Sequence, residues 1–324
     1  MKVHFRKESW ALKKTFRFAG HTIAASDVVI VELRREDHVG RGEATGVIYR
    51  GETPDTICEQ IAAVADRLTD ETTPQTLREI LPWGGARNAI DCALWDLLCK
   101  ETGKTIWQVL DIAPCPVATV NTVGLDPIAE AAVQAESLAA FPLLKVKLDA
   151  NDPLRRLSAI RAARPDARII VDANQSWDLT LLRDVVQPLA ALGVEMIEQP
   201  LPAGRDEGLA DFVSPIPLYA DESCFVAAEV AGLKDRYQGI NIKLDKSGGL
   251  TEALDMVRAA KDCGLSIMVG NMIGTSLSMA PNHVIAQFCR WVDMDGPLAL
   301  VHDREHGLFY DGPLVSPPTR ELWG

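Results

Sequence analysis

Three apolar runs in the sequence each end in a carboxylate, and they follow one another along the chain. The runs "IIVDAN", "MIEQP" and "LYADES" place Asp172, Glu198 and Asp221 at their ends. A single carboxylate in such a position most often caps the next helix. Three at matched strand ends converge, because neighbouring strands lie about 4.8 Å apart, and they repel one another unless they share protons or a cation. Oxygen ligands without histidine or cysteine favour Mg²⁺ or Mn²⁺ over zinc, so we expect one such ion per subunit.

Lysines stand on both sides of these carboxylates in the sequence. The run "LLKVKLDA" carries Lys145 and Lys147, which strand alternation places on one face. Taken alone, this pair fits an edge strand with a solvated face. Lys243 in "INIKLDK" follows the carboxylates, so in a closed barrel Lys147 and Lys243 would approach the metal from opposite sides.

Two opposed lysines could invert a stereocentre. A carbon next to a metal-bound carboxylate is acidified, so one lysine could remove its proton and the other could return a proton to the opposite face. A lysine acts as a base near neutral pH only when burial or a positive neighbour lowers its pKa. We expect Lys145 and the metal to supply that positive charge.

The elements that would position these residues form a regular series. From about Val117 onward, short apolar runs recur about every 25 residues, the length of one strand, one crossover helix and two loops. Amphipathic helical stretches such as "DPLRRLSAIRAAR" and "TEALDMVRAAKDCG" lie between them. No G-x-G-x-x-G follows any of these runs. The pattern therefore favours a closed (β/α) barrel, whose active site lies at the carboxyl ends of its strands.

The first third of the chain has a different pattern. The run "SDVVIVELRRE" is strand-like, "VGRGEATG" is typical of a turn into a second strand, and "TPDTICEQIAAVADRL" and "ARNAIDCALWDLLCKETGK" have helical spacing. We therefore predict an α+β domain over residues 1–112, the barrel over 113–300 and a C-terminal segment over 301–324.

Composition limits the classes of partner. The chain has 324 residues, 47% of them hydrophobic, and a formal net charge of −12, which argues against nucleic acid and anionic membranes. The seven cysteines contain no C-x-x-C pair and are typical of reduced core residues. The start "MKVHFRKESW" lacks the apolar core of a signal peptide, and no apolar run is long enough to span a bilayer. We expect a soluble cytoplasmic protein that forms a homo-oligomer.

Several motifs together resemble one known family. "KVKLDA", "VDANQSW", "IEQPL", "ADES" and "INIKLDKSGG" are similar to the muconate-lactonizing-enzyme subgroup of the enolase superfamily, and "AIDCALWDLLCKETGKTIWQVL" resembles the end of its capping domain. The resemblance implies a modified (β/α)7β TIM-like barrel, an N-terminal α+β capping domain completed by the C-terminal tail, one Mg²⁺ and enolate chemistry. It implies Asp172, Glu198 and Asp221 as metal ligands, Lys147 and Lys243 as the acid/base pair, and Lys145 and Asn174 as accessory groups.

A final motif discriminates among the reactions of the subgroup. "VDMDGP" carries Asp293 and Asp295, which resemble the D-x-D of dipeptide epimerases that holds the ammonium group of the substrate. "GNMIGTSLSMAP", with Gly270 and Met272, also resembles the epimerase pattern. The resemblance therefore implies a Mg²⁺-dependent epimerase that inverts the α-carbon of the C-terminal residue of a dipeptide such as Ala-Glu.

The motif that would recognise glutamate departs from the family pattern. Epimerases acting on Ala-Glu tend to carry an arginine in the N-terminal loop, whereas "FRFAGH" has Gly20 at that position. Arg50 in "YRGET" could serve instead, so a dipeptide with another C-terminal residue stays open. An N-acylamino acid racemase, an o-succinylbenzoate synthase or a cycloisomerase of the same subgroup is the alternative. A barrel without catalysis, used as a binding protein, is the non-enzyme alternative.

Two further motifs rank lower as sites. "KSGG" (Lys246 to Gly249) could cradle a phosphate, but its glycines fit a tight turn into the next helix better. "HDREH" (His302 to His306) has two histidines four residues apart, a spacing that binds metal only on a helix. We interpret it as a surface turn.

Overall fold

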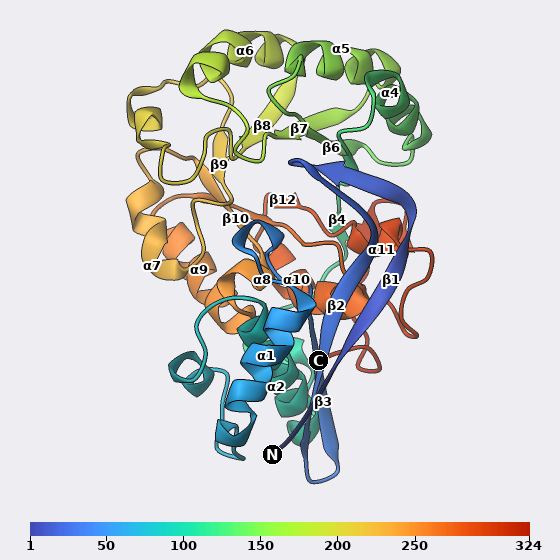
Figure 1. Cartoon of the computed structure of the whole chain (residues 1–324), viewed down its shortest axis with the longest axis vertical. Coiled ribbons are helices and arrows are strands. Elements are labelled where there is room, and N and C mark those ends of the chain that lie inside the picture. Colours follow the sequence, from blue (N-terminus) through green and yellow to red (C-terminus); the bar gives the residue numbers. More distant parts are fainter.

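The computed structural model describes all residues, 1–324, and shows a cap at one end of a barrel (Figure 1). The cap contains an antiparallel sheet in the order β1-β2-β3. Its paired strands β1 and β2 form a long ribbon that leaves the cap and runs along the barrel (Figure 1). The elements of the cap are β1 (Lys2–Phe18), β2 (His21–Arg35), β3 (His38–Ala44), η1 (Ile48–Arg50), α1 (Pro54–Val64), η2 (Ala65–Arg67), η3 (Thr76–Glu79), α2 (Gly85–Thr102) and α3 (Ile106–Leu110).

Local sequence signals explain where the cap helices begin and end. Thr53 and Thr56 form a capping box at the start of α1, whose first residue is a proline. Helix α2 ends at Gly103, which adopts a left-handed φ of 66°. Strand β3 packs closely on α2 because Gly42 has no side chain: a Cβ there would lie 2.0 Å from the carbonyl oxygen of Ala89.

The barrel is an eight-stranded parallel sheet in the order β12-β11-β10-β9-β8-β7-β6-β5. A backbone hydrogen bond of 2.9 Å from Val120 N to Val292 O links the segment before its first strand to its last strand, so the sheet curls round on itself. The strands are β5 (Asn121–Val123), β6 (Leu143–Lys147), β7 (Arg168–Asp172), β8 (Val194–Glu198), β9 (Leu218–Ala220), β10 (Gly239–Ile242), β11 (Ser266–Val269) and β12 (Trp291–Val292).

Helices connect the neighbouring strands of this sheet except between β8 and β9, where only the 3-10 turn η4 (Glu207–Asp211) lies. The helices of the barrel are α4 (Ile128–Ser137), α5 (Pro153–Ala163), α6 (Leu179–Ala191), α7 (Ala227–Val230) with η5 (Ala231–Leu233), α8 (Leu244–Ser247), α9 (Leu250–Asp262), α10 (Ser276–Ala286) and α11 (Gly296–Ala299). This strand order confirms the predicted (β/α)7β barrel. The predicted division at residues 112 and 300 stays a proposal.

The C-terminal segment returns to the cap, as predicted. Strands β13 (Tyr310–Asp311) and β14 (Leu314–Val315) pair with β4 (Val117–Ala118) in a small sheet. Beyond them, Trp323 is completely buried and its indole N–H donates to the carbonyl oxygen of Cys92 in α2. Gly324 N donates to Asp96 in the same helix.

The segment "HDREH" is more than the surface turn that the sequence predicts. Its two histidines are exposed, but Arg304 is partly buried and pairs with Glu43 of β3 and Glu8 of β1 at 2.8 Å each. Asp303 accepts a hydrogen bond from Ser276 N at the start of α10. The motif therefore joins the cap to the barrel.

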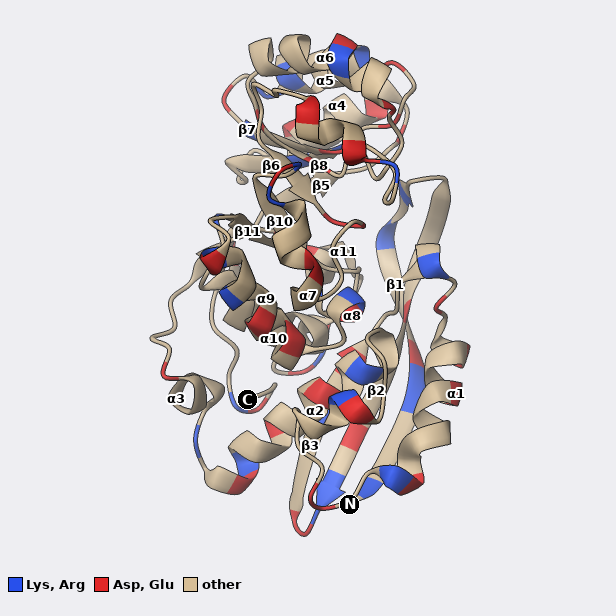
Figure 2. Cartoon of the chain, turned by 90° about the vertical axis from the view of Figure 1, so that its left-hand side faces the viewer, with Lys and Arg blue, Asp and Glu red and all other residues tan.

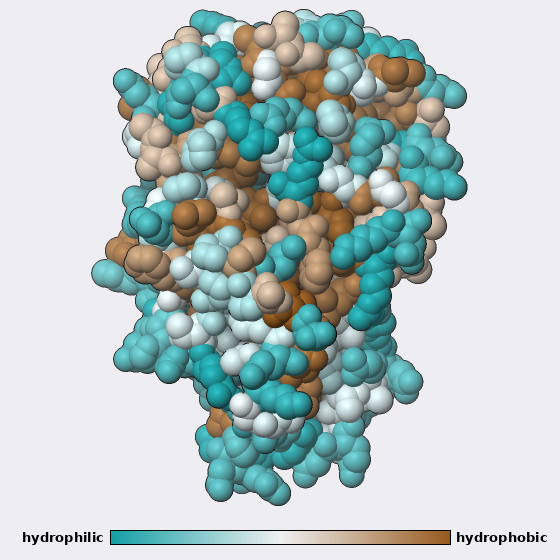
Figure 3. Space-filling view, turned by 180° about the vertical axis from the view of Figure 1, so that it is seen from behind, coloured by the Kyte–Doolittle hydropathy of each residue, from teal (hydrophilic) through white to brown (hydrophobic).

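The surface is charged and mixed in sign. Figure 2 shows basic and acidic residues side by side on α2 and α9. On the face seen in Figure 3, hydrophilic residues cover most of the cap, and apolar residues show mainly over the barrel. None of the helices is both long and apolar enough to cross a lipid bilayer.

Candidate active site

Alternation along the barrel strands produces two layers of inward side chains. The lower layer is mainly apolar and includes the buried cluster of Val120, Ile170, Met196, Tyr219, Met268 and Trp291. The next inward positions, at the carboxyl ends of the strands, carry the predicted chemical groups. They are Lys147, Asp172, Glu198, Asp221, Lys243, Gly270 and Asp293, and each of them is buried. Strand pairing sets Lys147 opposite Asp172 and Asp172 opposite Glu198.

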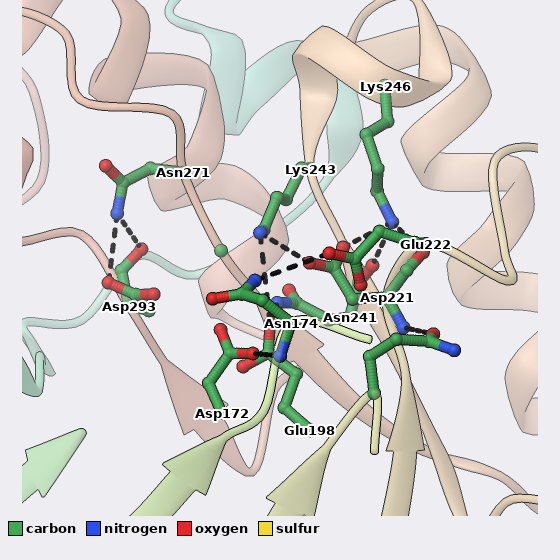
Figure 4. Close-up of polar contacts among 12 residues, drawn as sticks. Asp172, Asn174, Glu198, Asp221, Glu222, Asn241, Lys243, Lys246, Asn271 and Asp293 are labelled. Carbon is green, nitrogen blue, oxygen red and sulfur yellow. Dashed lines mark hydrogen bonds and ion pairs between the residues drawn. The ribbon is translucent and has the colours of Figure 1, made fainter. Parts of the chain in front are cut away.

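The two predicted acid/base lysines each hold a different carboxylate. Lys147 Nζ lies 2.7 Å from Asp172 Oδ2, and Lys243 Nζ lies 2.6 Å from Asp221 Oδ2. Lys147 stands on β6 and Lys243 directly after β10, so the strands that carry the three carboxylates, β7 to β9, lie between them. Figure 4 shows Lys243 beside Asp221.

The predicted accessory residues connect this cluster. Lys145 Nζ contacts Glu198 Oε2 at 2.7 Å, Asp293 Oδ2 at 3.0 Å and Asp172 Oδ2 at 3.1 Å. Asn174 accepts a 2.9 Å hydrogen bond from Lys147 Nζ through its Oδ1. The face with two lysines therefore looks inward, which excludes the solvated edge strand.

The neighbouring carboxylates decide the protonation state of Lys243 in this structure. Burial alone would lower the pKa of Lys243, but the charges of Asp221 and Glu198 outweigh it and raise that pKa above its usual value. Burial would likewise raise the pKa of Asp221, but Lys243 and Lys246 outweigh it and hold that pKa far below its usual range. Lys243 therefore stays an ammonium as long as it faces Asp221, and it can act as a base only after that contact is broken.

The three predicted metal ligands form an oxygen-only donor set. No three side chains of the metal-binding types surround one point in the structure, because ammonium groups lie between the carboxylates. Asp172, Glu198 and Asp221 nevertheless come from adjacent strand ends at matched height. The neighbouring Glu222 has a buried Oε2 without a hydrogen-bond partner. This donor chemistry fits a hard divalent cation such as Mg²⁺, which Asp172, Glu198 and Asp221 would hold.

Two cavities meet at Lys147 and Lys243. One, of about 240 Å³, is lined by Asp293, Asp295 and the β1 side chains from Lys13 to Phe16. The other, of about 470 Å³, extends beneath the β1–β2 hairpin and includes His21, Tyr49 and Met272. Both include the two lysines, so a substrate carbon between the lysines could place one substituent in each cavity.

Asp293 and Asp295 share the smaller cavity but have different partners. Asp293 faces Lys145 and accepts a 3.0 Å hydrogen bond from Asn271 Nδ2 through its Oδ1. Asp295 Oδ2 accepts a 2.7 Å hydrogen bond from Thr122 N. Burial, and then the nearby charge of Asp293, raise the pKa of Asp295 to about 7. A positively charged group of a ligand would relieve this repulsion.

The remaining predicted residues divide into two groups. Gly270 makes room for a catalytic candidate, since a Cβ there would lie 2.8 Å from Lys243 Cε, and Met272 lines the larger cavity. Arg50 is exposed and lies over the rings of Trp83 and Phe225 at 4.2 and 5.0 Å, outside both cavities. The structure therefore does not bring Arg50 together with the other predicted residues.

Sequence reasoning missed several residues of the site. Asn241 donates a 2.7 Å hydrogen bond to Glu198 Oε1, and strand alternation could have found it two positions before Lys243. Tyr49 of η1 lines the larger cavity together with Glu222. Although the residue is 37% exposed, desolvation and the charges of Asp221 and Glu222 raise the pKa of its hydroxyl. His21 lines the larger cavity from the hairpin tip. Nothing in the local sequence of these last two residues indicates that the hairpin tip and η1 reach the barrel.

Two family models match the chain. Residues 1–111 match the N-terminal domain of mandelate racemase/muconate lactonizing enzyme. Residues 128–315 match the enolase C-terminal domain-like family. The two matches together span most of the sequence.

Characterised relatives are similar over almost their whole length. The chain is 42% identical to the L-Ala-D/L-Glu epimerase of Escherichia coli over 305 residues, which cover 93% of this chain and 95% of that protein. It is 40% identical to the N-acetyl-D-glutamate racemase of a Pseudoalteromonas species over 299 residues, covering 92% and 95%.

Solved structures agree with the fold. An enolase family member from Agrobacterium tumefaciens with homology to dipeptide epimerases, solved with sodium and L-Ala-L-Glu, superposes with a TM-score of 0.97 at 43% identity and 99% coverage of both chains. A dipeptide epimerase from Enterococcus faecalis, complexed with Mg and L-Leu-L-Tyr, superposes with a TM-score of 0.91 at 30% identity, covering 98% of this chain and 96% of the other.

Proposed function

The chain belongs to the mandelate racemase/muconate lactonizing enzyme family of the enolase superfamily, and from this premise we propose that it is a Mg²⁺-dependent dipeptide epimerase. Its relatives are epimerases and racemases, and the protein is an isomerase. The proposed reaction inverts the α-carbon of the C-terminal residue of a dipeptide. L-Ala-L-Glu is the first substrate to test, because the Escherichia coli relative is named for it and the Agrobacterium structure binds it.

The proposed mechanism uses the two lysines as opposed proton carriers. Asp172, Glu198 and Asp221 would hold Mg²⁺, whose charge makes the α-hydrogen of a bound substrate carboxylate more acidic. One lysine, as a neutral amine, takes the α-proton. The other, as an ammonium, delivers its own proton to the opposite face of the carbon. The substrate leaves inverted, and each lysine ends in the protonation state in which the other began.

The opposed placement of the lysines supports inversion rather than simple exchange. Lys147 Nζ is held by Asp172 and Asn174 on the β6–β7 side, whereas Lys243 Nζ is held by Asp221 on the β10 side. A substrate in the cavities would have to separate at least one lysine from its carboxylate. The buried surroundings then favour the neutral amine of the lysine that is released.

The pair of Asp293 and Asp295 is the observation that carries the choice of a dipeptide. These carboxylates face a cavity that also reaches both lysines, and a dipeptide presents an ammonium group some distance from its carboxylate. Muconate and succinylbenzoate carry two negative charges and no cation, so these carboxylates would repel them.

One observation favours an N-acylamino acid racemase as the second candidate. Lys145 already balances the charge of Asp293 at 3.0 Å, so a neutral acyl group could enter the smaller cavity with less repulsion than two free aspartates would cause. The 40% identity to an N-acetyl-D-glutamate racemase supports the same candidate.

Solvent exchange distinguishes the two candidates. The protein with Mg²⁺ in D₂O is incubated with L,L-dipeptides, including L-Ala-L-Glu, and in parallel with N-acetyl and N-succinyl amino acids. Incorporation of one deuterium at the α-carbon of the C-terminal residue, with inversion, is expected for dipeptides. Exchange on the N-acylated compounds alone would replace the first proposal by the second, and exchange on neither set would contradict both.

A further inference from the structure

Lys246, the first residue of the "KSGG" motif, lies in α8 and is a buried lysine that the proposed mechanism does not use. Its side chain is completely buried and lies behind Asp221 (Figure 4). Its Nζ contacts Asp221 Oδ1 at 2.6 Å, Cys224 O at 2.9 Å, Asn241 O at 3.1 Å and the carbonyl oxygen of Asp221. It lines neither of the cavities that reach the catalytic candidates, so it cannot touch a substrate there.

The two oxygens of Asp221 face different ammonium groups. Oδ1 pairs with Lys246, and Oδ2 pairs with Lys243. Lys243 lines both cavities, whereas Lys246 is enclosed by protein. Lys246 therefore fixes the Asp221 carboxylate through one oxygen, and the other oxygen faces Lys243, the lysine that lines the cavities.

Lys246 is also connected, through Asn241, to a second proposed metal ligand, Glu198. The backbone carbonyl of Asn241 accepts from Lys246, while the Asn241 side chain donates to Glu198 Oε1 at 2.7 Å. One ammonium group thus contacts one proposed ligand directly and supports the residue that orients another. A buried ammonium needs such partners, because an unpaired charge in the interior is strongly unfavourable.

The cap contacts the C-terminal end of α8, the helix that carries Lys246. The side chain of Arg87 in α2 donates to Ser247 O at 2.6 Å and to Gly248 O at 3.1 Å. Gly248 and Gly249 have left-handed φ values of 83° and 112°, and a Cβ on Gly248 would lie 2.4 Å from Arg87 Nε. The glycines are needed both for the turn and for the close approach of the cap helix.

We propose that Lys246 is a positioning residue of the metal site. It pairs with Asp221 Oδ1 and so fixes the orientation of the carboxylate, whose Oδ2 faces Lys243. Asp221, held in this orientation, would be one of the residues that hold the divalent cation, and its contact with Lys243 would compete with that role. This inference rests on the proposed function only in taking Asp221 as a ligand of Mg²⁺.

Mg²⁺ binding without substrate tests the inference. Isothermal titration calorimetry compares the wild type with Lys246→Gln and with a matched control, Lys234→Gln, whose lysine is exposed. We expect Lys246→Gln to weaken Mg²⁺ binding about 10- to 100-fold, the effect typical of residues that orient metal ligands, and the control to bind like the wild type. Unchanged Mg²⁺ affinity in Lys246→Gln, with only a lower melting temperature, would overturn the inference while leaving the proposed function intact. A wild type that binds no Mg²⁺ would overturn both.

A double-substitution cycle covers the case in which Lys246→Gln does not fold. Melting temperatures are compared for Asp221→Asn, Lys246→Met and the double variant. If Lys246 acts through Asp221, its replacement lowers the melting temperature less in the Asp221→Asn background, because the carboxylate left unpaired in the single variant is gone. An equal loss in both backgrounds would mean that Lys246 only satisfies backbone carbonyls, and the inference would be wrong.

Discussion

At the scale of single residues, the proposed mechanism assigns Lys147 and Lys243 to opposite faces of one substrate carbon. Replacing either by alanine should reduce epimerisation about 10²- to 10⁴-fold, the usual contribution of a general acid or base. Each variant should lose deuterium incorporation from one epimer more than from the other, because each lysine faces the α-hydrogen of only one. Mass spectrometry and chiral chromatography of both epimers in D₂O measure this.

Two features make this result specific. Each variant should still exchange the α-hydrogen of the epimer that faces its remaining lysine, without inverting it, whereas replacing the exposed Lys234 should change nothing. Equal residual exchange of both epimers in both variants would contradict the assignment of the two faces.

A pH dependence follows from Asp295. Its pKa is raised to about 7, first by burial and then by Asp293, so the carboxyl becomes protonated as the pH falls through 7 and attracts an ammonium group less. Lys145, the nearby cation on Asp293, stays charged throughout this range. The KM for a dipeptide should therefore rise between about pH 7 and 5.5, where the substrate ammonium is almost fully protonated, and Asp295→Asn should remove most of this change. Steady-state kinetics of the wild type and of Asp295→Asn at fixed Mg²⁺ measure this change in KM. A KM that rises equally in the two proteins would argue against an ammonium site at Asp295.

Much of the site could be predicted because its residues repeat with the barrel. Asp172, Glu198 and Asp221 end successive strands in the sequence, and the structure gathers them with Lys145, Lys147 and Lys243. The direction of the Lys243 pKa could not be predicted in the same way, because it depends on carboxylates brought close only by folding. Tyr49 and His21 could not be predicted for a related reason. They lie outside the barrel repeat, in η1 and at the hairpin tip, where the sequence has no periodic pattern that shows which surface it covers.

At the scale of elements, the contact between β3 and α2 limits the size of side chains. A Cβ at position 42 would lie 2.0 Å from the Ala89 carbonyl oxygen, within the backbone of α2. Gly42→Ala should therefore destabilise the protein by about 3 kcal/mol, the upper end of the usual cost of overpacking, as measured by denaturant unfolding.

Gly232→Ala is the matched control, because nothing lies within 4 Å of a Cβ at that position. Its effect should stay within about 0.5 kcal/mol, as for most surface substitutions. A Gly42→Ala variant as stable as Gly232→Ala would mean that β3 and α2 can separate without loss.

The β1–β2 hairpin is held to the barrel by charge. Asp126 is buried and pairs with Lys14 and Arg17 of β1; burial would raise its pKa, but these two cations outweigh it and lower that pKa. Asp126→Asn should loosen the hairpin tip, whose residues 16–23 border the larger cavity. We expect faster amide deuterium exchange at the tip and a KM raised a few-fold, with kcat changed less.

Asp111→Asn, at an exposed aspartate of the cap, is the control for this change and should alter neither quantity. Exchange at residues 16–23 that is the same in Asp126→Asn and the wild type would show that apolar packing, rather than this ion pair, holds the hairpin.

The sequence predicts the elements that repeat regularly, but it does not predict the features that depend on tertiary contacts. The regular spacing of apolar runs predicts the eight parallel strands, but the same spacing also suggests a helix between β8 and β9, where the structure has only the turn η4. Likewise, the segment "HDREH" joins the cap to the barrel through Arg304. Its partners Glu8 and Glu43 are so distant in the sequence that no local pattern indicates this contact.

At the scale of the whole molecule, the cap and the barrel build one site together. The Asp245 carboxylate, two residues after Lys243, accepts hydrogen bonds from Thr45 N at 2.9 Å and Gly46 N at 3.1 Å, just before the turn that carries Tyr49. The hairpin and η1 contribute walls that no barrel strand provides. The cap therefore shapes the larger cavity, while the barrel supplies the residues of the proposed chemistry. The predicted homo-oligomer stays a prediction.

The burial of Trp323 against α2 has a consequence for the order of folding. The indole of Trp323 meets a carbonyl 231 positions earlier in the chain, and Gly324 O accepts from Ile106 N at the start of α3. During synthesis, residues 1–112 leave the ribosome long before this partner exists, so the apolar face of α2 stays uncovered until the barrel strands have been made. The cap is thus the first part of the chain to be synthesised and the last to acquire all of its contacts. A fragment of residues 1–112 released on its own should expose this face of α2 and aggregate.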